Sequence, residues 1–175
     1  MPSPVGCVVG PKGLCRRARR AILWAAPRPS TVGPVNEWSR GASFTEAAEA
    51  FLTRPLHAVL ATHAPDGGLS QSVVWFHLDG ATVWLSCSPR SVKVRHIRAD
   101  PDVSLLVLAP HGGAYVRIEG LATVDEIVTP EQRHELVVPY QGADTAQWLD
   151  EHPLEQPNTL VRIHPRRVVS TGLGE

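Results

Sequence analysis

A short polar run, residues 86–96 (SCSPRSVKVRH), holds the side chains of this sequence that are best suited to bind an anion. The run follows a strand-like stretch and begins a predicted helix, for which Ser88 is a suitable N-cap and Pro89 a favoured first residue. Free N–H groups at a helix start attract anions. Three basic residues of the run would lie near them: Arg90, Lys93 and Arg95. The pattern predicts a pocket for a phosphate group, and hence for a nucleotide-like cofactor.

Other kinds of chemistry find less support in the sequence. The eight histidines show neither HxxxH nor HExxH spacing, so no metal centre is expected. There is no Gly-x-Ser-x-Gly elbow and no Walker-type phosphate loop. The three cysteines form no CxxC pair and favour a reducing, cytoplasmic setting. Among them, Cys87 is better interpreted as a small buried hydrophobic residue than as a nucleophile.

Length and composition indicate one globular domain. A chain of 175 residues with 43% hydrophobic residues is large enough to bury a core. The formal net charge of zero hides an asymmetry, because residues 1–40 carry seven Lys or Arg and one acid (+6), whereas residues 41–175 carry ten and sixteen (−6). A body with this negative balance is not expected to bind nucleic acid. No apolar run approaches the roughly 20 residues needed to cross a bilayer.

The first forty residues are predicted to be a basic, disordered tail, and residues 41–175 the folded domain. Residues 1–40 are rich in Pro, Gly and Arg and show no sustained hydrophobic period. Residues 16–26 superficially resemble a secretory or twin-arginine leader. Pro27 ends their apolar run too early for a signal peptide, which needs about 7–15 apolar residues. An export leader, or a basic arm for a membrane surface or nucleic acid, remains the less favoured alternative.

The pattern of residues 41–175 predicts short strands separated by tight turns. Ser43 and Glu46 form a capping-box pattern for a first helix, and Thr129 and Gln132 form another for a helix to about Val137. A further helix is expected over residues 143–149. The predicted strands cover residues 57–62, 69–78, 82–87, 103–108, 115–124 and, around Pro165, 160–164 and 166–171. The prediction is a mainly β (α+β) fold, a small antiparallel barrel with short flanking helices.

One predicted strand shows its inward face clearly. Along residues 115–124, Val116, Ile118, Ala122 and Val124 alternate with polar residues and should face the core. Gly120 interrupts this row. A glycine inside a strand indicates a bulge or the close approach of another backbone.

Four stretches of the chain form a recognisable series. They are Leu60-Ala61-Thr62 with Asp66-Gly67, Val74-Trp75-Phe76 with Asp79-Gly80, residues 91–97 followed by residues 100–105, and Tyr115 to Ala122 with its Gly-x-Ala pattern. In their order and spacing they resemble the pyridoxamine-phosphate-oxidase-like, FMN-binding split-barrel superfamily. The resemblance covers roughly residues 44–125, with a weaker echo at 161–165, and its best match within the superfamily is the branch of probable F420-dependent enzymes.

The resemblance implies a six-stranded split β-barrel, a homodimer, and cofactor sites at the dimer interface. It also implies that Lys93 contacts the cofactor phosphate, with Ser88, Ser91 and Arg95 nearby. The strand 71–75 and the strand end 86–88 would provide the ring slot and hydrogen bonds to its pyrimidine edge. The candidate cofactor-binding residues are therefore Gln71, Ser72, Val74, Trp75, Ser86, Cys87, Ser88, Ser91, Lys93 and Arg95.

Several of these residues also have a purely structural interpretation. Lys93 could be a solvated charge on a helix, and Arg95 could pair with Asp100 or Asp102. Trp75 could be a core or dimer-interface aromatic, which is the favoured interpretation for Trp84. Ser72 could equally fill space in the core or at the surface.

The expected function is that of an oxidoreductase with a flavin-type cofactor, deazaflavin F420 being favoured, which passes hydride to or from a small organic substrate. The alternatives are an FMN-dependent reductase or oxidase, and a non-catalytic carrier of flavin, F420 or haem. No catalytic residue is expected, because the chemistry resides in the cofactor ring. The last eight residues contain no arginine, which argues against vitamin-B6 oxidation. Loops around residues 109–114 and 138–158 are expected to select the substrate.

Overall fold

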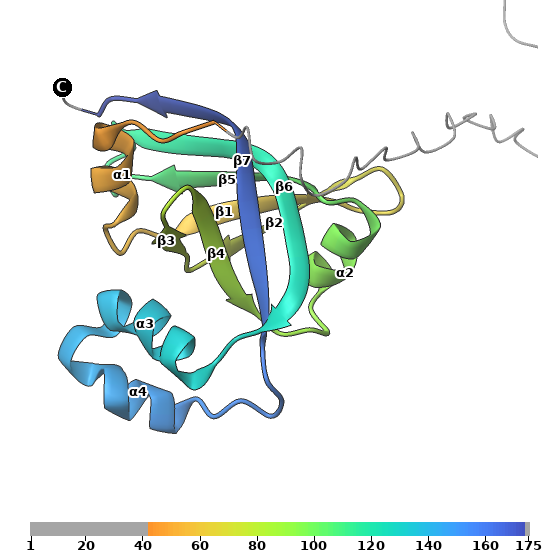
Figure 1. The fold of residues 1–175 in the computed structure, drawn as a ribbon, viewed down its shortest axis with the longest axis vertical. Helices are drawn as coiled ribbons and strands as arrows, with labels where there is room; N and C mark the ends of the chain where they lie inside the picture. The colour runs from red at the N-terminus through yellow and green to blue at the C-terminus, as the bar shows by residue number, and fades with distance from the viewer. Residues whose placement is uncertain (1–41, 174–175) are drawn as a thin grey trace, which may run out of the picture. The chain divides into compact units, whose positions relative to one another are not determined.

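Seven antiparallel strands form one sheet, with the strand order β2-β1-β5-β6-β7-β4-β3. The computed structural model describes residues 42–173, and in it the sheet curves around its own core (Figure 1). The strands are β1 (Ala58–His63), β2 (Leu69–Val74), β3 (His77–Asp79), β4 (Thr82–Cys87), β5 (Asp102–Leu108), β6 (Tyr115–Ile127) and β7 (Thr159–Thr171). The helices are α1 (Glu46–Leu52), α2 (Val92–Ala99), α3 (Pro130–Gln141) and α4 (Thr145–Glu151), with a 3-10 turn at Gly142–Asp144. The predicted antiparallel split barrel is confirmed.

The strand predicted over residues 69–78 is in fact two strands, so the sheet has seven strands rather than six. β2 pairs with β1 at one edge of the sheet, whereas β3 pairs with β4 at the other edge. Trp75 and Phe76 connect the two edges. The side chain of Phe76 is buried in the core, which turns the chain inward at this corner. No Gly or Pro marks the break, so the pattern of the sequence gave no sign of it.

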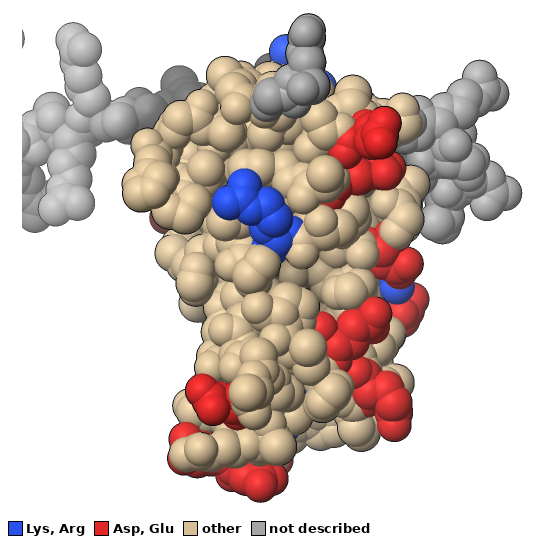
Figure 2. All heavy atoms as spheres, turned by 90° about the vertical axis from the view of Figure 1, so that its left-hand side faces the viewer, with Lys and Arg blue, Asp and Glu red and all other residues tan. Residues whose placement is uncertain are grey.

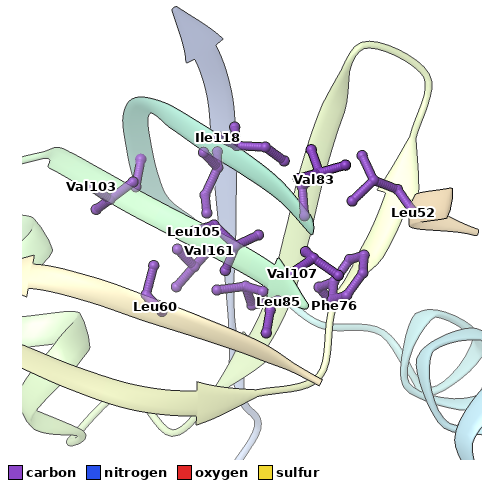
Figure 3. Close-up of a cluster of buried hydrophobic side chains, with 14 of the residues drawn as sticks. Leu52, Leu60, Phe76, Val83, Leu85, Val103, Leu105, Val107, Ile118 and Val161 are labelled. Carbon is purple, nitrogen blue, oxygen red and sulfur yellow. The ribbon is translucent and has the colours of Figure 1, made fainter. Parts of the chain in front are cut away.

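The core fills the interior of the curved sheet (Figure 3). Alternate residues of the strands point inward, as the period of two requires. Leu60, Leu105 and Ile118 lose all of their accessible surface. On β6 the inward row is the predicted one, with Val116, Ile118, Ala122 and Val124 all buried.

The interpretation of Gly120 is also confirmed. The pairing of β6 with β7 shifts register between Glu119 and Gly120, where Gly120 lies opposite Pro165. A Cβ atom on Gly120 would lie 2.2 Å from the carbonyl oxygen of His164. Only glycine permits this approach of the two backbones.

Helix α2 begins later than predicted. Ser91, not Ser88, is its N-cap, and the helix starts at Val92. The predicted start fails because Ser88 and Pro89 belong to a turn, which the Ser91 N–H closes by donating to the Ser88 carbonyl at 2.9 Å. Proline after serine suits a turn as well as a first helical residue. A similar shift occurs at α1, where Thr45 rather than Ser43 is the N-cap.

Residues 129–158 leave the barrel between β6 and β7 and form α3 and α4; they are called the α3–α4 excursion below. It lies beside the barrel near β3 and β4 (Figure 1). The Thr129–Gln132 capping box is confirmed, but α3 runs past Val137 and through Pro139. The predicted helix at 143–149 is observed two residues later, as α4.

Two further expectations concern the first forty residues and the absence of a membrane-spanning segment. The predicted tail, residues 1–40, lies outside the described residues. Within residues 42–173, no helix has the length and apolar character needed to span a membrane.

Candidate cofactor-binding site

A cavity of about 670 Å³ lies between the barrel and the α3–α4 excursion. Its barrel side is built by the end of β2, the end of β4 and the start of α2. Most of the residues predicted for cofactor binding line it: Val74, Trp75, Ser86, Cys87, Ser88, Ser91 and Lys93. Two segments from near opposite edges of the sheet, residues 74–75 and 86–93, are thus brought together at this cavity.

Three predicted residues do not line this cavity. Arg95 lies exposed on α2, two residues beyond Lys93 and therefore on a different face of the helix. Gln71 is exposed on β2, and Ser72 is half-buried opposite Leu60 of β1. Their roles in cofactor binding remain predictions.

The ion pairs considered for Arg95 are not found among the described residues. Asp100 instead contacts the Nδ1 atom of His63 at 3.0 Å, and Asp102 contacts Arg166 at 3.3 Å. All four of these side chains are substantially exposed, so each pair contributes little to stability.

The polar end of the cavity, formed by Ser88, Ser91, Lys93 and the start of α2, is called the anion corner. The Oγ atom of Ser91 is buried and has no hydrogen-bond partner among the described residues. As N-cap it would normally accept from a backbone N–H of α2, but it makes no such bond. An unpartnered buried hydroxyl is costly, because it has lost its hydrogen bonds to water. With the half-buried Lys93 at the second helical position, this corner has the donors that a phosphate group requires.

Cys87 lies next to the anion corner, and its thiol is not expected to be reactive. Burial raises the pKa of its thiol to about 11, while the positive charge of Lys93 partly opposes the rise. The thiol is therefore protonated at neutral pH and is not an activated nucleophile. With 5% of its surface exposed, Cys87 packs as part of the hydrophobic core, in agreement with its interpretation from the sequence.

Trp75 and Trp148 line another part of the cavity and are called the aromatic wall. The Trp75 ring stacks on the ring of Tyr140, with 4.6 Å between centroids and 9° between planes. Trp148 of α4 lies 5.3 Å from Trp75 at a tilt of 43°. Trp75 Nε1–H donates to His57 Nε2 at 3.1 Å, which places the proton of a neutral His57 on Nδ1. A flat molecule can pack against such a surface.

Trp84, by contrast, does not belong to the cavity. It is buried to within 2% of its surface and packs with Val128, Leu136 and Leu160. Trp84 is thus a buried structural aromatic, but it lies outside the predicted barrel core and packs between β4 and α3.

The sequence did not single out the residues that the excursion contributes. Of the two loops expected to select the substrate, residues 138–158 contribute to the cavity lining, whereas residues 109–114 do not. Asn158 Nδ2 donates to Ser86 Oγ at 2.9 Å, which attaches the end of the excursion to β4. The cavity residues not identified from the sequence pattern are His57, Val73, Arg133, Leu136, Val137, Trp148, Glu151, His152, Pro153, Leu154 and Asn158. Among residues 42–173, no cluster of three His, Cys, Asp or Glu could hold a metal ion.

Barrel, anion corner and aromatic wall together define a split-barrel protein with a cofactor-sized cavity. The family model described as pyridoxamine 5'-phosphate oxidase matches residues 44–172. The chain therefore belongs to the pyridoxamine 5'-phosphate oxidase family. No protein of curated function matches the sequence.

Solved structures give the same fold. An F420 reductase is 27% identical, with 72% of this chain and 98% of that chain covered and a TM-score of 0.52. A conserved hypothetical protein from Mycobacterium tuberculosis is 27% identical, with 75% and 87% covered and a TM-score of 0.58. A heme binding protein from Mycobacterium smegmatis is 21% identical, with 75% and 55% covered and a TM-score of 0.54. This last similarity concerns the fold alone.

Proposed function

We propose that this protein is an oxidoreductase that binds a flavin-type cofactor, F420 in preference to FMN, and exchanges hydride between it and a small organic substrate. The observation that carries the proposal is the pairing, within one cavity, of the anion corner and the aromatic wall. The buried, unpartnered Oγ of Ser91 fits a ligand that supplies the missing hydrogen bond.

The anion corner would bind the cofactor phosphate. The Lys93 ammonium and the free N–H groups at the start of α2 donate toward the same region as the Ser91 hydroxyl. Ser88 precedes them in the turn and adds a second hydroxyl. Because Lys93 is half-buried, its charge is less screened than that of a fully exposed lysine.

The aromatic wall and the apolar strand ends would hold the flat ring. When bound, a flavin or deazaflavin accepts or donates a hydride on its own ring. Val74 and Trp75 would position that ring and keep water from it, while the Ser86 hydroxyl and nearby backbone groups would meet its polar edge. No side chain of this chain needs to act as an acid or a base.

The preference for F420 rests on the similarity to an F420 reductase, at 27% identity across nearly all of that chain. FMN is the alternative, since the matching family is that of pyridoxamine 5'-phosphate oxidase. A carrier that stores a flavin, F420 or haem without catalysis is the third possibility. It needs the same phosphate site and differs only in lacking hydride transfer.

We further propose that the protein acts as a homodimer in the cytoplasm. Two large apolar side chains on one face of β2, Leu69 and Val73, are 70% and 66% exposed. Gln71 lies between them on the same face. A second copy of the chain would cover this face and would bring Gln71 into a site shared between protomers.

Binding titrations of F420 and FMN side by side test the proposal. We expect the wild-type protein to bind F420 more tightly, as followed by the cofactor band near ~420 nm (F420) or ~450 nm (FMN). Lys93→Ala should weaken binding by roughly 1.5–3 kcal/mol, about 10- to 150-fold, which is the range for a charge-assisted hydrogen bond. Arg98→Ala is the matched control, because Arg98 is exposed on the same helix away from the cavity.

The outcomes separate the alternatives. Binding of neither cofactor, or binding that Lys93→Ala leaves unchanged, would contradict the site. Tighter binding of FMN would favour the FMN-dependent enzyme. Stable binding without hydride transfer to any of a panel of acceptors would favour the carrier. A monomer at micromolar concentration in light scattering would contradict the dimer.

A further inference from the structure

The α3–α4 excursion is strongly acidic, yet its one Lys or Arg side chain lines the cavity. Acidic residues gather at the lower end of the face shown in Figure 2, over the excursion. Among residues 129–158 there is one arginine, Arg133, and it lines the cavity. No described carboxylate lies within ion-pair distance of it, although the excursion carries Glu131, Glu135, Asp144, Asp150, Glu151 and Glu155.

Two of those carboxylates are engaged with other partners. Glu135 contacts His77 Nε2 at 3.3 Å, and Glu151 accepts a hydrogen bond from Gln147 Nε2 at 2.8 Å. An arginine surrounded by acids would ordinarily pair with one of them. Arg133 therefore has no ion-pair partner among the described residues, although it lies at the cavity wall.

The guanidinium of Arg133 is nevertheless held in a defined position. Its Nη2 donates to the carbonyl oxygen of His152, and its central carbon lies 5.9 Å from the centre of the Trp148 ring. The rings of Trp148 and His152 are themselves stacked, with 4.3 Å between centroids. One face of the group is thus fixed by protein, and the remaining N–H donors are available to a ligand.

We infer that Arg133 and Trp148 form a substrate subsite for a flat, conjugated molecule that carries one carboxylate. The inference rests on the proposed function, because it takes the rest of the cavity as the cofactor site. Arg133 binds the carboxylate, and the conjugated plane packs against the part of the Trp148 ring that the stacked His152 leaves uncovered. The cofactor phosphate has its own cation in Lys93, on a different element.

The charged residues around the subsite determine which ligand charge it favours. Glu151 lines the same side of the cavity as Arg133. A dianionic phosphate would meet more repulsion from Glu151 than a monoanionic carboxylate, while a neutral molecule would leave Arg133 uncompensated. The subsite therefore selects for a single negative charge.

Two probes of equal shape test the inference: 2-naphthoate and its uncharged amide, 2-naphthamide. Binding is followed by quenching of tryptophan fluorescence, to which Trp75 and Trp148 of the cavity contribute. We expect the wild-type protein to bind the carboxylate at least tenfold more tightly than the amide. Arg133→Gln should abolish this preference while leaving the affinity for the amide unchanged. Arg98→Gln, on exposed α2, should keep it.

An equal affinity of the wild-type protein for both probes would overturn the inference, as would a preference that survives Arg133→Gln. Arg133→Lys keeps the positive charge and serves if the glutamine variant does not fold. It should retain a reduced preference for the carboxylate, and a complete loss in a folded lysine variant would count against the subsite.

Cofactor titrations keep this inference distinct from the proposed function. Arg133→Gln should bind F420 and FMN as the wild-type protein does. A tenfold loss of cofactor affinity would assign Arg133 to the cofactor and overturn the substrate subsite. If the wild-type protein bound neither cofactor yet distinguished the two probes through Arg133, the proposed function would fail and the carboxylate subsite would stand.

Discussion

The barrel and the α3–α4 excursion form the two sides of one cavity, but they are held in place by different forces. The barrel is stabilised by a continuous core, in which Leu60, Leu105 and Ile163 have no exposed surface. The described excursion buries little of its own. Among the described residues of 129–158, only Leu136, Val137 and Thr145 are buried.

A few specific contacts attach the excursion to the barrel. The Tyr140 hydroxyl lies 2.9 Å from the Leu56 carbonyl and 3.2 Å from both backbone groups of Phe76, so it can donate to one carbonyl and accept from the Phe76 N–H. Its ring stacks on Trp75. The barrel side of the cavity is therefore fixed by the fold, whereas we expect that the excursion side can change without unfolding the barrel.

The largest expected effect is in the barrel. Leu105→Ala should lower the free energy of unfolding by about 2–5 kcal/mol, because it leaves a cavity in a fully buried position. Leu149→Ala removes the same atoms from a half-buried position in α4 and should cost only about 1 kcal/mol. Urea denaturation measures both values. Equal losses would remove the distinction between the two regions.

The second largest effect is expected from alkaline pH, which should lower the free energy of unfolding through Cys87 on the barrel side. The pKa of Cys87 is about 11 in the folded protein against 9.0 for an unburied thiol, so the folded state holds its proton more tightly. Stability from this group is complete below pH 9 and is lost as pH rises toward 11, by up to roughly 2–3 kcal/mol. Denaturation at several pH values should show this fall, and Cys87→Ala should lack its share of it. An identical pH dependence in the variant would contradict the prediction.

Tyr140→Phe should weaken the attachment of the excursion to the barrel. This change keeps the stacking on Trp75 but removes the hydroxyl that serves Leu56 and Phe76, at an expected cost of about 1–2 kcal/mol. As denaturant is added to this variant, the tryptophan fluorescence of the cavity should change at a lower concentration than the one that unfolds the barrel. Tyr115→Phe on β6 is the control and should change neither signal. A single concerted transition in Tyr140→Phe would show that the excursion and the barrel are not separable.

The smallest effect is expected at the start of α3. Thr129→Ala removes the side chain that accepts from the Gln132 N–H in the capping box, which should cost about 1 kcal/mol. Thr129→Ser keeps the hydroxyl and should cost less. Thermal unfolding of the two variants gives the comparison. Equal melting temperatures would show that the Thr129 hydroxyl does not stabilise the start of α3.

The barrel could be predicted from the sequence to a large extent because its signals are local. Alternating apolar residues and Gly-containing turns determine β1, β4, β5 and β6, and Gly120 marks its own bulge. Two features could not be read in this way. The break at Trp75–Phe76 follows from the burial of Phe76, and the start of α2 required a choice between two serines that are both good caps.

The same contrast holds within the candidate site. Ser88, Ser91 and Lys93 belong to one continuous run, so their proximity followed from their spacing. Arg133 and Trp148 lie on two helices whose packing alone brings them to the cavity. No motif connects them, and only the tertiary structure places them beside residues of β2 and β4.

The position of β7 has a consequence for how this chain acquires its structure. β4 has β7 as its partner on the inner side of the sheet, yet α2, β5, β6 and the excursion are all synthesised between the two strands. The hairpin of β3 and β4 must therefore wait, with one edge open, until the ribosome has released residues 159–171. Such delayed, non-local pairing slows folding and exposes strand edges to aggregation. A ribosome-stalled chain ending before residue 159 should accordingly be far more sensitive to protease than one that includes β7.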